Sequence, residues 1–149
     1  MRLRIGEYVY TEHDAEIIGS YMKDFLQIQE EKNKDEDFQP ILLINTLRSE
    51  HEAYEKLDNY KKKVVDSFKK SMDAYSDGCF IHILPTILIS AFAITCLCLD
   101  PGNWYKVGVI GCISFLFTLD LEYVLSHHNL KILKKAIGKH VFDEAEKSI

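Results

Sequence analysis

The sequence lacks the features that mark nucleic-acid-binding proteins, secreted proteins and enzymes. Its 149 residues sum to a net charge of −5 and contain no basic stripe, so the phosphate-neutralising charge that nucleic-acid binding requires is missing. Residues 1–11 include no apolar segment of the signal-peptide type, and synthesis in the cytoplasm is expected. The sequence shows no nucleophilic residue with a catalytic base at a recognisable spacing, and it shows no glycine-rich phosphate-binding loop. We therefore expect no enzyme activity, no cofactor and no nucleic-acid partner.

Cysteine is scarce and does not form a recognisable metal or disulfide framework. The four cysteines lie inside apolar runs, at Cys79, Cys96, Cys98 and Cys112. Free cysteine in such runs behaves as a small hydrophobic residue, so we expect reduced core residues. The alternative is a zinc site that adds His82 or the pair His127-His128 to these cysteines. The spacing does not repeat as a zinc finger or ribbon would, and no metal site is predicted.

Charge is unevenly distributed along the chain. Residues 1–78 hold 12 Lys/Arg and 17 Asp/Glu, a net of −5, whereas residues 79–149 hold six of each. A polar half is therefore joined to an apolar half. At this length one domain with a hydrophobic core is the default, and residues 1–149 are interpreted as a single domain.

The polar half shows the spacing of amphipathic helices. Residues 1–11 have no evident strand partner and are expected to form an extended arm. Thr11 is a suitable N-cap, with Asp14 three residues later. Apolar residues then recur at three- and four-residue intervals, which predicts a helix over residues 12–31.

Two more helices are predicted before the apolar half begins. A solvated linker covers about residues 30–37, and Pro40 is placed where a first-turn proline is tolerated. The helix that it opens is expected to run to about residue 58. A third, shorter helix is predicted over residues 61–76, where a Ser-Asp-Gly sequence ends it.

Two apolar runs, Cys79–Leu99 and Val107–Leu119, flank a turn signal at Asp100-Pro101-Gly102. They could fill a protein core or cross a membrane as a hairpin. The first run is long enough to span a bilayer but contains His82 and Pro85. The second has 13 residues, whereas a spanning helix needs about 20. Basic residues outside the hairpin satisfy the positive-inside rule. We favour the core, and the membrane hairpin is the alternative.

A last helix is predicted from an N-cap at Ser126 through Val141. In this interpretation His127-His128 is its polar first turn. Asp120 and Glu122 are interpreted as charges at a helix end rather than as a pair of catalytic carboxylates.

The segment from Asp100 to Val107 resembles the first homology motif of the Bcl-2 family, whose usual form is Asp-Gly-x-Asn-Trp-Gly-Arg-Ile/Val. Leu47-Arg48-Ser-Glu-His51-Glu52-Ala-Tyr54 resembles the third motif of the same family. Residues 16–21, 107–123 and 126–142 are similar to its first, central and sixth helices. The resemblance covers roughly residues 12–146, and only its Asn-Trp element is specific.

Several positions depart from the family pattern. Tyr105 replaces the glycine after the tryptophan, and Lys106 replaces an arginine that pairs with an aspartate of the bound helix. Lysine keeps the charge but loses the planar fork that binds a carboxylate through two hydrogen bonds. His51-Glu52 stands where the third motif has Gly-Asp, so the chain is not expected to act as a pro-death ligand itself. The second motif is missing, and no tail anchor is evident; this compactness resembles viral members.

The resemblance implies an all-α, Bcl-2-like helical bundle in which a central apolar hairpin is wrapped by amphipathic helices. It implies a pro-survival inhibitor of apoptosis that sequesters the amphipathic BH3 helix of pro-apoptotic proteins in a surface groove. Such a protein would act in the cytoplasm or at the mitochondrial surface, with peripheral membrane association, and could form a homodimer. Carried over position by position, the groove comprises Tyr54, Leu57, Val64, Phe68, Ala93, Leu97, Asn103, Trp104, Tyr105, Lys106, Val107 and Val109. For Trp104 a core anchor, and for Lys106 a solvated lysine, are the alternatives.

The competing hypothesis is a two-pass membrane protein, either a pore-forming effector or an immunity-type protein. In this hypothesis residues 1–78 form a cytosolic helical region and the two apolar runs enter the bilayer.

Overall fold

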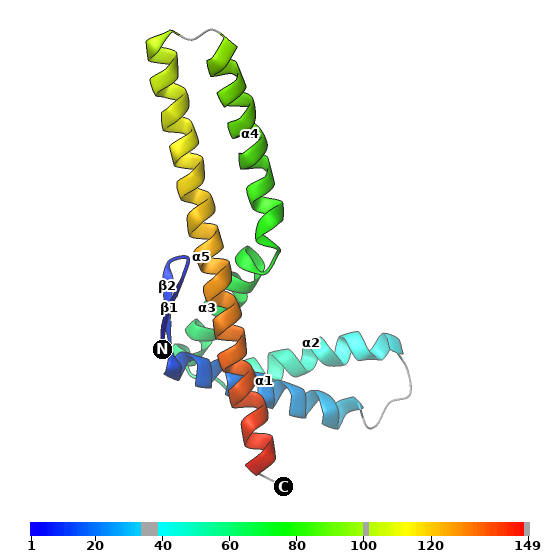
Figure 1. Ribbon diagram of the computed structural model, residues 1–149. Coiled ribbons are helices and arrows are strands. Elements are labelled where there is room, and N and C mark those ends of the chain that lie inside the picture. Colours follow the sequence, from blue (N-terminus) through cyan, green and yellow to red (C-terminus); the bar gives the residue numbers. More distant parts are fainter. Residues whose placement is uncertain (34–38, 100–101, 148–149) are drawn as a thin grey trace.

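The computed structural model describes the backbone of residues 1–33, 39–99 and 102–147, and the side chains of residues 1–31, 46–99 and 102–142. The elements are β1 (Arg2–Ile5), β2 (Tyr8–Thr11), α1 (Glu12–Asn33), α2 (Gln39–Glu55), α3 (Asn59–Tyr75), α4 (Cys79–Leu99) and α5 (Asn103–Lys147). The predicted all-helical class is confirmed in its coarse form, because helices dominate and two short strands accompany them. Figure 1 shows a bundle from which α4 and the first half of α5 project as a long two-helix hairpin.

The expected N-terminal arm is instead a β-hairpin. β1 and β2 pair antiparallel, with Ile5 opposite Tyr8. Gly6 has a φ of 58°, and no non-glycine residue of the described chain has a positive φ. This pattern fits a two-residue type II′ turn, in which glycine occupies the first central position. The arm prediction was wrong because the strand partner lies immediately along the chain.

The predicted N-cap of α1 is confirmed. The Thr11 backbone N–H and hydroxyl both donate to the Asp14 carboxylate, at 2.8 and 2.9 Å, and the Thr11 hydroxyl accepts from the Asp14 N–H at 3.3 Å. The two residues thus satisfy the free N–H groups of the first turn reciprocally. Tyr60 at the start of α3 donates a further hydrogen bond of 3.0 Å to the Asp14 carboxylate. Asp14 therefore joins the N-termini of α1 and α3.

The predicted second helix runs three residues too far. Asp58 does not continue α2, because its side chain accepts a hydrogen bond of 2.9 Å from the Lys61 N–H and caps α3. The predicted linker over residues 30–37 falls in part on 34–38, which lie outside the described residues. The same holds for Asp100 and Pro101 of the predicted turn.

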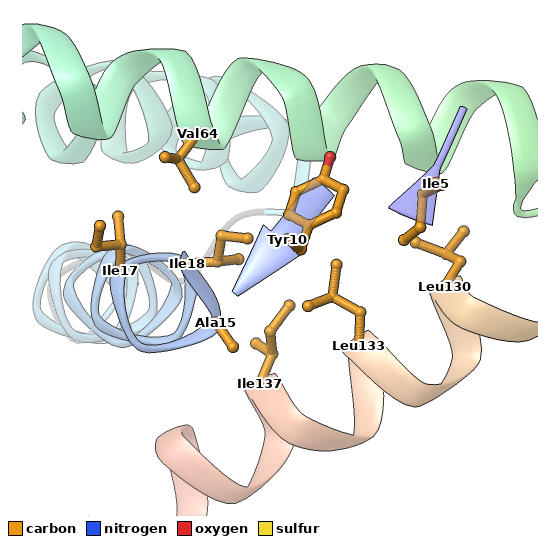
Figure 2. Packing of buried hydrophobic residues seen from close by; sticks show 9 residues of the cluster. All are labelled: Ile5, Tyr10, Ala15, Ile17, Ile18, Val64, Leu130, Leu133 and Ile137. Atoms are coloured by element: carbon orange, nitrogen blue, oxygen red, sulfur yellow. The ribbon is translucent and has the colours of Figure 1, made fainter. Parts of the chain in front are cut away.

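The core of the bundle lies between the β-hairpin, α1, α3 and the second half of α5 (Figure 2). Its buried residues are Ile5, Tyr10, Ala15, Ile17, Ile18, Val64, Leu130, Leu133 and Ile137. The Tyr10 hydroxyl shares a hydrogen bond of 2.8 Å with the Ser71 hydroxyl, which satisfies both buried groups. A second cluster joins α1, α2 and α3 through Tyr21, Ile28, Ala53 and Val65.

Two predictions about the apolar half are wrong. No new helix begins at Ser126, because α5 continues unbroken to Lys147 and the Ser126 hydroxyl accepts a hydrogen bond of 3.2 Å from the Gly6 N–H. The run Val107–Leu119 is not a packed core helix, because most of its side chains are exposed. The bundle core takes its α5 residues from the second half of the helix, so the first half projects beyond it.

The four cysteines likewise lie outside the packed core. Cys98 and Cys112 are exposed, and Cys79 and Cys96 are half-buried, all four as free thiols. The expected core position is therefore wrong for each of them, because all four belong to the projecting hairpin.

Leu133→Ala tests the bundle core. Leu133 is fully buried, so truncation should lower the free energy of unfolding by about 2–5 kcal/mol. Leu88→Ala is the matched control, because Leu88 lies on the exposed face of the hairpin and its truncation should leave the bundle's stability within about 0.5 kcal/mol. Chemical denaturation of the detergent-solubilised chain, followed by circular dichroism, measures both. Equal losses would contradict the assignment of the core.

Tyr10→Phe tests the buried hydroxyl. Burial raises the pKa of Tyr10 to about 12, and the hydrogen bond to Ser71 opposes that rise. The neutral phenol therefore contributes stability at pH values below 10, and this contribution is lost as the pH rises towards 12. The variant should be less stable at pH 8, where Ser71 loses its partner, and should lose less stability than the parent between pH 10 and 12. Parallel stability curves over this range would contradict the prediction.

Candidate functional site

The projecting hairpin is held together by a narrow seam between α4 and α5. The partly or fully buried residues of α4 recur at intervals of four and three, at 79, 83, 86, 90, 93 and 97, and Cys96 beside the last of these is also partly buried. In the hairpin half of α5 they recur likewise at 109, 113, 116, 120 and 123, and near the bundle residues 124, 126, 127, 129 and 130 are also partly or fully buried. This is the heptad spacing by which two helices pack along a single stripe. Each helix thus covers only one face of its partner.

The outward faces of the hairpin are apolar and exposed. On α4 they consist of Phe80, Ile81, Leu84, Ile87, Leu88, Ile89, Phe92, Ile94 and Leu99. On α5 they consist of Trp104, Tyr105, Val107, Ile110, Phe115, Phe117, Leu119, Leu121 and Leu125. A helix pair in water carries polar residues on these faces, and monomeric soluble proteins rarely expose so large an apolar surface. This apolar surface must therefore be covered, either by an apolar medium or by another molecule.

Two hydroxyls on the exposed faces bond within their own helices. Thr95 donates to the Ala91 carbonyl and Thr118 donates to the Ser114 carbonyl, each at 2.9 Å and four residues back. A hydrogen bond to the carbonyl four residues back satisfies a hydroxyl group where no water is available. Both threonines are thereby compatible with an apolar surrounding.

Three other polar residues of the hairpin, Thr86, Ser90 and Asp120, face the seam, whereas His82, Lys106, Ser114 and Glu122 are exposed. Thr86 donates a hydrogen bond of 3.2 Å to the Asp120 carboxylate across the seam. Ser90 lies next along the same face of α4 and is buried. The Ser90 hydroxyl and the second Asp120 oxygen are buried without a hydrogen-bond partner among the described residues. Asp120 and Glu122 both lie within α5, so their interpretation as charges at a helix end was wrong.

Aromatic residues mark both ends of the hairpin. At the bundle end the Tyr123 ring lies 4.2 Å from the His82 ring and 5.5 Å from the Tyr75 ring, measured between centroids. At the turn end Trp104 is 89% exposed and Tyr105 is exposed beside it. With a rise of about 1.5 Å per residue, Trp104 and Tyr123 are separated along α5 by about 29 Å. This separation matches the hydrocarbon thickness of a bilayer, about 30 Å.

The base of the hairpin is fixed to the bundle by hydrogen bonds. His127 bonds through Nδ1 to the Tyr75 carbonyl at 2.7 Å, and the Tyr123 hydroxyl donates to the Asp77 carbonyl at 3.2 Å. His127 thus lies in the middle of α5, where it contacts the end of α3, and the prediction of a polar first turn at His127-His128 was wrong. The hairpin is consequently a fixed extension of the bundle.

The residues of the predicted groove are not brought together. Tyr54, Leu57 and Phe68 are partly buried against the bundle clusters, and Val64 is fully buried in the core. The rest of the predicted set, which comprises Ala93, Leu97, Asn103, Trp104, Tyr105, Lys106, Val107 and Val109, belongs to the far half of the hairpin. Figure 1 shows α2 and α3 within the bundle, and it shows the end of α4 and the start of α5 at the far end of the hairpin.

Sequence reasoning missed Thr86, Ser90 and Asp120 as one group. A heptad spacing in the sequence could have revealed this group. One face of α4 carries positions 79, 83, 86, 90, 93 and 97, and one face of α5 carries positions 109, 113, 116 and 120. The heptad spacing was overlooked because the length of the second apolar run was counted as uninterrupted apolar residues, and that count ended at Asp120. A carboxylate that faces the partner helix does not end an apolar surface.

Comparison of the chain with protein-family models, with curated proteins and with solved structures finds no match.

Thr86→Val tests the polar contact across the seam. The variant leaves the buried Asp120 carboxylate without its donor, so it should destabilise the hairpin by about 1–3 kcal/mol. The double variant Thr86→Val with Asp120→Leu should recover most of this loss, because replacing both partners by apolar groups is nearly neutral. Thr118→Val is the control, since that hydroxyl bonds only its own helix. Thermal unfolding in detergent measures all three, and additive losses in the double variant would contradict the contact.

Proposed function

We propose that the chain is a membrane-anchored protein whose α4–α5 hairpin enters a lipid bilayer and holds the helical bundle at the membrane surface. The observation that carries this proposal is the exposed apolar outer face of both helices. Both helices are long and apolar enough to cross a membrane. Such helices can also be buried core helices or N-terminal signal sequences. Neither alternative fits here, because little of either segment is buried and neither lies near residue 1.

The dimensions and the polar groups of the hairpin support the same proposal. α4 has 21 residues, about 31 Å at 1.5 Å per residue, and carries no charged side chain. Tyrosine and tryptophan at both ends match the aromatic belts of membrane proteins. Between them Thr86, Ser90 and Asp120 face the seam, and Thr95 and Thr118 bond their own helices. Of the exposed polar side chains, Ser114 carries no charge, His82 and Glu122 lie at the bundle end, and Lys106 lies near enough to the turn to reach the opposite surface.

The charge distribution indicates an orientation. Lysines lie on α3 before the hairpin, at Lys61, Lys62, Lys63, Lys69 and Lys70, and on α5 after it, at Lys131, Lys134, Lys135 and Lys139. The turn end holds only Lys106 together with Asp100. By the positive-inside rule the bundle faces the cytoplasm.

Phe92→Arg tests insertion. A single arginine in the middle of α4 costs about 2.5–3.5 kcal/mol in a membrane-spanning segment, so the fraction of chain that floats with lipid vesicles after an alkaline wash should fall sharply. Ser20→Arg is the matched control, because Ser20 lies on an exposed face of α1 in the bundle. Equal flotation of both variants, or a parent chain that stays soluble and monodisperse without detergent, would contradict the proposal.

Gly102→Cys, in a background with the four native cysteines replaced by alanine, tests the two-pass topology. Gly102 lies at the turn between α4 and α5. In sealed vesicles that display the bundle outside, a membrane-impermeant maleimide should label this position only after permeabilisation. Glu7→Cys in the same background marks the bundle side and should react without permeabilisation. Labelling of both positions from outside would show that the hairpin does not cross the bilayer.

The Bcl-2-like groove hypothesis stays a prediction, supported by the sequence resemblance around Asn103 and Trp104. It requires the two predicted walls to face each other, and in the present arrangement they lie apart. Calorimetric titration with BH3 peptides tests it: micromolar or tighter binding that weakens in Lys106→Glu would support a groove. Absence of binding to every peptide would refute sequestration without affecting membrane anchoring.

A further inference from the structure

A cavity of about 530 Å³ lies where the bundle meets the base of the hairpin. The turn of the β-hairpin provides Glu7 and Tyr8, α3 provides Ser67, Lys70 and Tyr75, and α5 provides Glu122. The volume falls within the range of small-molecule sites, about 300–1,000 Å³. Ile5, Gly6, Ser71 and Ala74 complete the lining. Ile5 and Ser71 also take part in the core, and Tyr75 also contacts the base of the hairpin.

The cavity is placed at the membrane surface if the hairpin inserts as proposed. Glu122 precedes Tyr123, which belongs to the aromatic group at the bundle end of the hairpin. The β-turn is fastened beside it, because the Gly6 N–H donates to Ser126 one helical turn further along α5. In Figure 1 this turn points towards the end of the bundle from which the hairpin rises. The cavity is therefore level with the lipid headgroups.

The charges in the cavity are of both signs and are not paired. Lys70, Glu7 and Glu122 form no ion pair or hydrogen bond within the described part of the chain, although they line one space. Opposite charges that share a cavity without touching leave room for a ligand that contacts both. The three side chains are exposed to solvent, and a ligand that contacts both signs of charge would carry an anionic and a cationic group.

The side chains specify these groups further. Lysine binds phosphate as a point charge, and the Ser67 hydroxyl beside Lys70 can donate a hydrogen bond to the same group. Two carboxylates suit a primary ammonium, which has three N–H donors. The faces of Tyr8 and Tyr75 can also attract a cation. A ligand that carries a carboxylate in addition to the phosphate and the ammonium would be repelled by Glu7 and Glu122.

We propose that this cavity binds a phosphodiester bearing a primary ammonium group, the chemistry of an ethanolamine phospholipid headgroup. The phosphate lies against Lys70 and Ser67, and the ammonium lies between Glu7 and Glu122. This inference rests on the proposed membrane anchoring only for the source of the ligand, since the same chemistry occurs in soluble glycerophosphoethanolamine.

The soluble compound tests the cavity itself. Glycerophosphoethanolamine is titrated by calorimetry into the full chain in a detergent without phosphate or amine groups. We expect binding that weakens about tenfold in Lys70→Glu and in Glu122→Gln, since one charged hydrogen bond contributes about 1.5 kcal/mol. Lys63→Glu is the matched control, because Lys63 lies on α3 outside the cavity and is exposed. Glycerophosphate, which lacks the ammonium, should bind at least tenfold more weakly than glycerophosphoethanolamine.

The possible outcomes distinguish whether the cavity binds this ligand chemistry from whether the ligand comes from a membrane lipid. Absence of binding, equal binding of the two compounds, or equal loss in Lys63→Glu would overturn the inference even if the chain floats with vesicles. Native mass spectrometry of chain extracted from vesicles of ethanolamine and choline lipids tests the source: preferential retention of the ethanolamine lipid, lost in Lys70→Glu, supports it. Binding of the soluble compound by a chain that does not insert would uphold the cavity and overturn both its lipid source and the membrane anchoring.

Discussion

The seam between α4 and α5 is the constraint on which the rest of the molecule depends. A helix pair that packs along one heptad stripe buries one face of each helix and leaves the others uncovered. In this chain the uncovered faces are mainly apolar from Phe80 to Leu99 and from Trp104 to Leu125, with His82, Lys106, Ser114 and Glu122 among the exposed polar exceptions. In water such a surface would drive aggregation, whereas in a bilayer it needs no further cover. Four of the polar residues follow the same division, since Thr86 and Asp120 meet in the seam and Thr95 and Thr118 bond their own helices.

The bundle gives the hairpin a fixed base. α5 belongs to both parts: its first half packs against α4, and its second half supplies Leu130, Leu133 and Ile137 to the bundle core. The junction is fastened where His127 bonds the last carbonyl of α3 and where Ser126 accepts from the turn of the β-hairpin. Because a single unbroken helix crosses the junction, the position of the bundle relative to the hairpin is set by backbone hydrogen bonds. The cavity around Lys70 and Glu122 is formed at this junction.

Much of the fold could be predicted from the sequence, because local chemistry determines it. The Thr11 cap, the amphipathic helix that follows it and the bounds of α4 rest on capping and periodicity. The β-hairpin was missed because its strands are four residues long and their turn depends on one glycine. The environment of the apolar runs could not be predicted, because a helix that is apolar all round suits a core and a bilayer equally well. What distinguishes them is which other helices pack on it, and that depends on contacts between Leu130 or Leu133 and residues more than 100 positions earlier.

The most direct test of the account is to ask whether the outer face of the hairpin touches lipid tails. Vesicles made with lipids that carry a photoreactive group in the acyl chain are illuminated with the chain bound, and the attachment sites are mapped by mass spectrometry. The account predicts attachment within residues 80–99 and 104–121 and none on the exposed faces of α1 and α3. Attachment confined to the bundle, or no attachment to the hairpin of a vesicle-bound chain, would contradict it.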